Sequence, residues 1–149
     1  MASSNLRHRR VQLTPAQQIG RMRSKFPGLA LSFKRGRLVW TGEWWPHALS
    51  NTYRIEVSYV LGRRPRTAIL SPQLELAEGK ARLPHVYVGG QSDICIHRPE
   101  EWTPGSFIAD TIMPWISQWL RFYEVWHLTG SWEGEGTHPE GDSHQRIET

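Results

Sequence analysis

The stretch Tyr53-Arg54-Ile55-Glu56-Val57-Ser58-Tyr59-Val60 alternates apolar and polar residues with a period of two. This alternation is typical of a strand that buries one face. Shorter runs of similar character precede and follow it at 29–33, 38–40 and 67–70, and turns are expected at 34–37 and 62–65. The pattern predicts an antiparallel meander of about four strands.

Helical patterns lie on both sides of this meander. Thr14 and Gln17 can form a capping box around Pro15, and a helix is expected from there to Pro27-Gly28. Apolar residues at spacings of three and four predict a second helix over 107–127, with Asp110 or Thr111 as its cap. One helix, a meander and a second helix together predict an α+β fold.

The length and composition limit the class of protein. A chain of 149 residues fits one domain, which we place at 13–138, between a flexible basic tail at 1–12 and a flexible tail at 139–149. The single cysteine, Cys95, excludes an intrachain disulfide and a multi-cysteine zinc site, and is consistent with a reducing compartment. No apolar run is long enough for a membrane span and no signal peptide is evident, so a cytoplasmic location is expected.

The positive charge is concentrated at the front of the chain. Residues 1–42 carry a net charge of +9 and the remainder carries −5, which gives the total of +4. Such a front suggests an acidic or phosphate-bearing partner, or a merely solvated positive face. Within it, Arg21, Arg23 and Lys25 lie on the first predicted helix and are candidates for partner binding.

Cys95 is the candidate nucleophile. A free cysteine between Ile94 and Ile96 is consistent with a buried structural residue. However, Cys95 lies late in a Pro- and Gly-rich loop, expected over 71–105, and such long loops are commonly functional. His85, His97 and Arg98 are close in sequence, and positive neighbours stabilise a thiolate, which is the reactive form.

The residues around Cys95 resemble the active-site stretch of ubiquitin-conjugating enzymes. In that family a His-Pro-Asn motif places its His ten positions before the cysteine, and a Trp follows the cysteine by seven or eight. Here His85 is ten positions before Cys95 and Trp102 is seven after it. The predicted order of helix, meander, long active-site loop and helix also resembles that fold.

The C-terminal part is similar to a bacterial branch, the small ubiquitin-conjugating-like proteins of cyclic-oligonucleotide antiphage (CBASS) operons, of the short type with the conjugating domain alone. The similar segments are Asp110-Thr111-Ile112-Met113-Pro114-Trp115, Trp119-Leu120, Tyr123-Glu124-Val125-Trp126, Thr129-Gly130-Ser131-Trp132 and Gly136-Thr137-His138. The resemblance implies that Cys95 takes the C-terminal glycyl group of a partner protein as a thioester and passes it to an acceptor. The implied partner is the cGAS-like nucleotidyltransferase (CD-NTase) of the operon.

The sequence departs from the family pattern at two positions. Tyr87 stands where the motif has Asn, and Val86 stands where it has Pro. Tyr87, His97 and His138 are therefore candidates for oxyanion or active-site support, and His85 for a catalytic or a loop-holding role. No cofactor or metal is expected, because a Cys95/His97 pair lacks two further ligands and no phosphate-binding loop is present.

Two other functions stay open. Tyr87 in place of Asn favours a catalytically silent protein-binding scaffold with the same fold. A nucleic-acid-binding module is favoured by the N-terminal arginines and by Trp40, Trp44 and Trp45, which could stack on bases. Trp102, Trp115, Trp119 and Trp126 are instead expected in the core.

Overall fold

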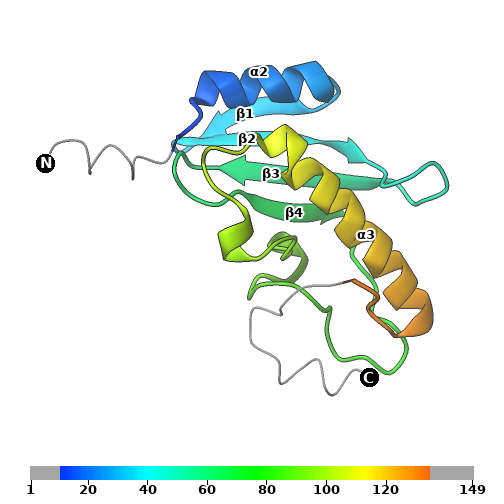
Figure 1. Cartoon of the computed structure of the whole chain (residues 1–149). Coiled ribbons are helices and arrows are strands. Elements are labelled where there is room, and N and C mark those ends of the chain that lie inside the picture. The colour runs from blue at the N-terminus through cyan, green and yellow to red at the C-terminus, as the bar shows by residue number, and fades with distance from the viewer. Residues whose placement is uncertain (1–10, 135–149) are drawn as a thin grey trace, which may run out of the picture.

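The computed structural model describes residues 11–134 and has the predicted α+β architecture (Figure 1). Its helices and strands are α2 (Pro15–Lys25), β1 (Ala30–Lys34), β2 (Arg37–Trp44), β3 (Tyr53–Tyr59), β4 (Arg66–Ser71) and α3 (Ile112–Thr129). Three single-turn 3-10 helices lie between β4 and α3: η1 (Gly90–Ser92), η2 (Pro99–Glu101) and η3 (Ile108–Asp110). Apart from positions 11 and 12, the tails predicted at 1–12 and 139–149 lie outside the described residues.

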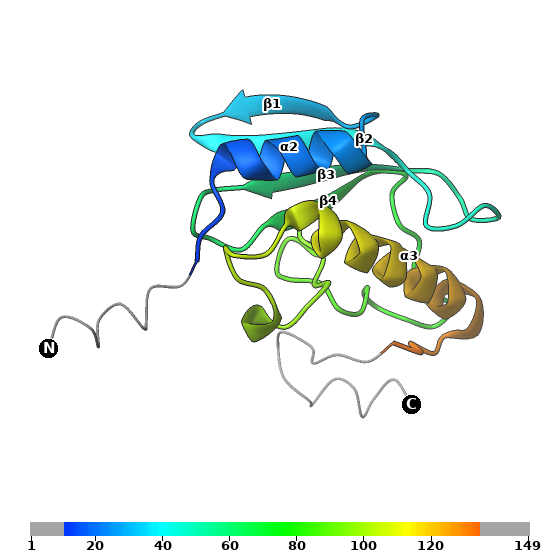
Figure 2. The same cartoon turned by 45° about the horizontal axis from the view of Figure 1, so that its top comes forward.

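The four strands form one antiparallel sheet in the order β1-β2-β3-β4, as the meander predicted. The alternation in β3 places Tyr53, Ile55, Val57 and Tyr59 on the buried face. Helices α2 and α3 cover this same face, and their buried residues share one core cluster with it (Figures 1 and 2). The long connection after β4 lies beside α3, where it can present residues next to a rigid helix.

Helix α2 begins as its sequence predicts and is fixed by a residue that the pattern does not reveal. Thr14 and Gln17 form the capping box. The side chain of Gln18 is 1% exposed, donates to the Ser106 carbonyl at 2.9 Å and accepts the Ile108 N–H at 2.9 Å. This amide therefore ties α2 to the segment that leads into α3.

Of the two residues expected to cap α3, Asp110 or Thr111, it is Thr111 that occupies the N-cap position. Its side chain makes no capping hydrogen bond, and its hydroxyl donates to the Phe107 carbonyl. The Asp110 carboxylate accepts from Arg21 Nε at 3.1 Å and from Lys25 Nζ at 2.8 Å, and these two cations lower its pKa. The pairing arises because η3 turns the chain toward α2 before α3 begins.

Most of the tryptophans predicted in the core are buried, including Trp102, Trp119 and Trp126. Trp115 is only partly buried, because it faces the cavity described below. The three tryptophans that were candidates for stacking on nucleic acid offer one largely exposed ring. Trp40 is buried, Trp44 packs edge-on against Phe26 and donates to Ser117, and Trp45 is 57% exposed.

We expect Gln18→Ala to lower the free energy of unfolding by about 2–4 kcal/mol, because it leaves one buried and one partly buried backbone group without partners. The matched control is Gln17→Ala on the same helix, which removes one exposed cap interaction and should cost less than about 1 kcal/mol. Urea denaturation followed by tryptophan fluorescence measures both. Equal losses in the two variants would contradict the tie between α2 and η3.

Candidate active site

The loop that carries Cys95 folds into a short hairpin. Val86 and Ile94 form an antiparallel bridge. Cys95 N–H donates to the His85 carbonyl at 2.9 Å, while Tyr87 N–H donates to the Asp93 carbonyl at 2.9 Å. The ten-residue spacing from His85 to Cys95 thus corresponds to two residues that pair across the open end of this hairpin.

The hairpin is fastened to the sheet and to the chain after β4. Ile94 N–H donates to the Thr67 carbonyl of β4 at 3.0 Å. The Gln91 side chain donates to the Ile69 carbonyl at 2.8 Å and accepts the Leu74 N–H at 2.8 Å. Sequence reasoning missed Gln91, because nothing in a lone polar loop residue indicates that its amide joins β4 to the chain that follows this strand.

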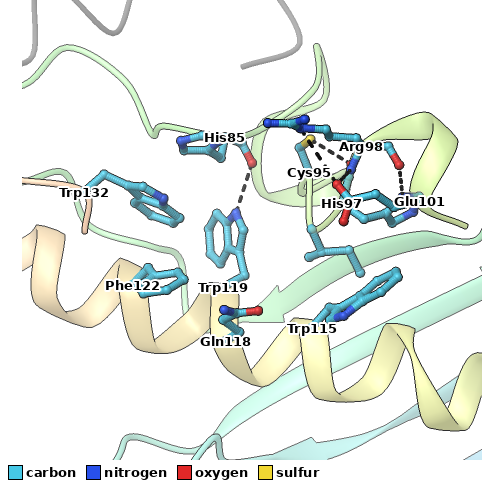
Figure 3. Close-up of a pocket in the computed structure, with 11 residues that line it drawn as sticks. His85, Cys95, His97, Arg98, Glu101, Trp115, Gln118, Trp119, Phe122 and Trp132 are labelled. Carbon is cyan, nitrogen blue, oxygen red and sulfur yellow. Dashed lines mark hydrogen bonds and ion pairs between the residues drawn. The ribbon is translucent and has the colours of Figure 1, made fainter. Parts of the chain in front are cut away.

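Cys95 lines a cavity of about 400 Å³ between this loop and α3 (Figure 3). The thiol is partly buried, and aromatic side chains form much of the opposite wall. The lining residues are His85, Cys95, Ile96, His97, Arg98, Glu101, Trp115, Gln118, Trp119, Phe122 and Trp132. A half-open cavity beside a cysteine can hold an extended chain end against the sulfur.

His85 lies in the cavity wall, and its backbone contacts organise the loop. Its carbonyl accepts both Cys95 N–H and the Trp119 indole N–H, the latter at 3.0 Å. Its φ of 50° lies in the left-handed region, which few residues other than Gly, Asn and Asp adopt readily. The imidazole stacks on Trp132 with the ring centroids 4.9 Å apart. These contacts favour a loop-holding role for this residue.

His97 also contacts the cysteine through its backbone. Cys95 Sγ donates to the His97 carbonyl at 3.6 Å. The His97 ring is buried, forms a hydrogen bond with the Arg98 carbonyl and lies 5.3 Å from the Trp115 ring. Its burial and these contacts favour a structural role for His97. His138, the third supporting candidate, lies outside the described residues.

Tyr87, at the position of the motif Asn, interacts with the Cys95 thiol. Its hydroxyl interacts with the Cys95 side chain, and this interaction is among the causes that lower the pKa of Cys95 and raise the pKa of Tyr87. Burial is the largest cause that raises the pKa of Tyr87 to about 12, so the phenol is a neutral donor at physiological pH.

The thiol is less acidic than the sequence led us to expect. Burial raises the pKa of Cys95 above its ordinary value, and the hydrogen bond from Tyr87 and the charge of Arg64 offset this only in part. The expected cations were His85, His97 and Arg98, yet the cation that lowers the pKa comes from the turn between β3 and β4. Arg64 is distant in sequence, so only the folded structure reveals it.

The candidate partner-binding residues lie apart from this cavity. Arg21, Arg23 and Lys25 are exposed on α2, and two of them pair with Asp110 as described above. None of the three lines the Cys95 cavity.

An N-terminal helix, a four-stranded antiparallel sheet, a loop-borne cysteine and a C-terminal helix define a ubiquitin-conjugating-like domain. The family model for type II CBASS E2 proteins, E2-CBASS, matches residues 18–139. The chain therefore belongs to this family, as its resemblance predicted, and has an E2-like role in CBASS antiphage defence. A search of curated proteins finds no match.

Within residues 11–134, no helix is both long and apolar enough to cross a membrane. Over the same range, no three potential metal-ligating side chains of His, Cys, Asp or Glu are grouped.

The raised pKa of Cys95 predicts the pH dependence of its alkylation. Because burial disfavours the thiolate, the rate of reaction with iodoacetamide should keep rising with pH beyond the midpoint of an ordinary cysteine. In urea, where the thiol is solvated, the midpoint should fall to the ordinary value. Mass spectrometry of the modified chain measures both profiles, and a folded midpoint below the unfolded one would contradict the burial effect.

Proposed function

We propose that Cys95 is an acyl carrier: it accepts the C-terminal glycyl group of a partner protein as a thioester and passes it to an acceptor. The carrying observation is the position of the thiol, which lines the cavity between its loop and α3. Membership of the E2-CBASS family supports the same chemistry.

The transfer consists of two acyl substitutions at the same sulfur. In loading, Cys95 loses its proton to solvent or to a base of the incoming complex, and the sulfur attacks an activated glycyl carbonyl whose leaving group departs with its electron pair. In discharge, a nucleophile attacks the thioester carbonyl and the C–S bond breaks, which returns the electron pair to sulfur. Tyr87 is placed to donate to the sulfur as this charge develops.

The aromatic wall of the cavity suits the lifetime of a thioester. Trp115, Trp119 and Phe122 come from successive turns of α3, and Trp132 follows that helix (Figure 3). Their rings reduce the access of water to the carbonyl, while the open side leaves room for a chain end. A flexible C-terminus that ends in Gly would fit beside the sulfur with little steric hindrance.

The proposed partner is the CBASS nucleotidyltransferase, and the exposed basic face of α2 is the proposed surface on which it docks. Arg23 projects from this helix, and among the described residues it makes no ion pair. An acidic patch on the partner would complement the face formed by Arg21, Arg23 and Lys25.

A second candidate function is a protein-binding scaffold with a silent cysteine. The raised pKa of the Cys95 thiol favours it, because a protonated thiol is a weak nucleophile. The two functions differ in whether defence requires the sulfur atom.

Replacement of Cys95 separates the carrier from the scaffold. In cells with the whole operon, wild type should form an adduct with the nucleotidyltransferase that thiol reagents cleave. Cys95→Ser should trap a more slowly transferred, thiol-resistant ester, and Cys95→Ala should form no adduct and lose protection against phage. Non-reducing gels and plaque assays measure these results. Full protection by a folded Cys95→Ala variant would rule out the carrier.

The docking surface has its own test. Arg23→Glu should weaken association with the nucleotidyltransferase at least several-fold, because it reverses a charge that no internal partner neutralises. The iodoacetamide reactivity of Cys95 should stay unchanged, since Arg23 does not line the cavity. The matched control is Arg54→Glu, which reverses an exposed charge on β3. Equal effects of the two substitutions, measured by surface plasmon resonance, would contradict docking on α2.

A further inference from the structure

We propose that Arg64 is a positioning residue that holds the Tyr87 hydroxyl on the Cys95 sulfur. Its role in acyl transfer rests on the function proposed above, whereas its effect on the thiol does not. Neither the family match nor the sequence pattern assigns a role to this arginine.

Arg64 reaches the active-site loop from another part of the fold. It belongs to the turn between β3 and β4, and its Cζ lies 4.2 Å from the centroid of the Tyr87 ring. A guanidinium at this distance stacks on the aromatic face and restricts the tilt of the ring. The direction of the Tyr87 hydroxyl is therefore set partly from outside its own loop.

Asp93 fixes the orientation of this guanidinium. Arg64 Nη2 lies 3.1 Å from Asp93 Oδ2, and Nη1 lies 3.4 Å from Oδ1, so the guanidinium and the carboxylate form a bidentate ion pair. The Asp93 side chain is nearly buried, and such a carboxylate needs charged or hydrogen-bonding partners. This bidentate geometry is specific to arginine, because a lysine ammonium is a point charge.

Arg64, Asp93, Tyr87 and Cys95 are linked by a continuous series of contacts. The backbone carbonyl of Asp93 accepts the Tyr87 N–H. The residue whose carboxylate pairs with Arg64 therefore lies directly opposite Tyr87 in the hairpin. The Tyr87 hydroxyl in turn meets Cys95 two residues after Asp93. The guanidinium of Arg64 therefore holds the Tyr87 ring beside the Cys95 thiol. If Arg64 moved, the Tyr87 ring would be free to turn its hydroxyl away from the sulfur.

This arrangement suits a sulfur that becomes negative during transfer. A cation on the face of the phenol draws electron density from the ring, which makes its hydroxyl a stronger donor. Arg64 also contributes its charge directly, since it lowers the pKa of Cys95 while Asp93 raises it. The other titratable residues around the cavity mouth are His85, His97, Arg98 and Glu101.

The structure supplies a matched control in Arg66. Its Nη2 lies 3.3 Å from the same Asp93 Oδ2, so it neutralises the same carboxylate from β4. No ring contact joins Arg66 to Tyr87 among the described residues, in contrast to Arg64. Loss of Arg66 therefore removes a nearby cation and leaves the Arg64 guanidinium stacked on the Tyr87 ring.

The test measures the pH profile of Cys95 alkylation by iodoacetamide in five folded full-length chains: wild type, Arg64→Gln, Arg64→Lys, Tyr87→Phe and Arg66→Gln. We expect the first three variants to shift the midpoint to higher pH and to slow alkylation several-fold at pH 8, because a hydrogen bond to the thiolate is lost. Arg66→Gln should stay within twofold of wild type. Circular dichroism and thermal melts confirm that the variants are folded.

Two results would overturn the proposal. If Arg64→Lys retains the wild-type profile, charge alone acts and the planar stack does not matter. If Arg66→Gln shifts the profile as much as Arg64→Gln, the effect belongs to Asp93. Should Arg64→Gln fail to fold, Arg64→Lys and Tyr87→Phe still decide the question. Because iodoacetamide needs no partner protein, this result is independent of whether Cys95→Ala abolishes defence.

Discussion

The carbonyl oxygen of His85 accepts two hydrogen bonds, and the geometry of the cavity follows from them. Cys95 N–H closes the loop on this atom, and the indole N–H of Trp119 joins the same atom to α3. A backbone oxygen with two donors places the cysteine at a set distance from a helix that is itself packed on the sheet. The left-handed backbone of His85 is the conformational cost of turning that oxygen toward both donors.

The fold could be predicted from the sequence where a local pattern has one structural explanation. The alternation in β3 and the capping box at Thr14 each specify an element through neighbours two or three residues away, and both occur as predicted. Asp110 shows the limit of such reasoning. As a cap it satisfied a local rule, but two cations on α2 compete for the same carboxylate, and only the tertiary fold brings them near.

The residues of the candidate site also differ in whether the sequence alone could indicate them. The resemblance located Cys95, His85 and Tyr87, because their spacing along one loop is a local property. It could not provide Arg64 or Asp93, whose pairing joins a turn of the sheet to the loop across 29 positions. The acidity of the thiol was also misjudged, since sequence neighbours indicate charge and do not show how far burial removes the sulfur from water. Electrostatics of this kind depends on distance in space.

The partial burial and raised pKa of the Cys95 thiol have a consequence for its oxidation. Peroxide and most cellular oxidants attack the thiolate, and a sulfur with a raised pKa presents little of it at neutral pH. With no second cysteine in the chain, an oxidised Cys95 would have no internal thiol to resolve it. The raised pKa of this thiol therefore slows its oxidation and keeps the single sulfur of the given sequence in the reduced form.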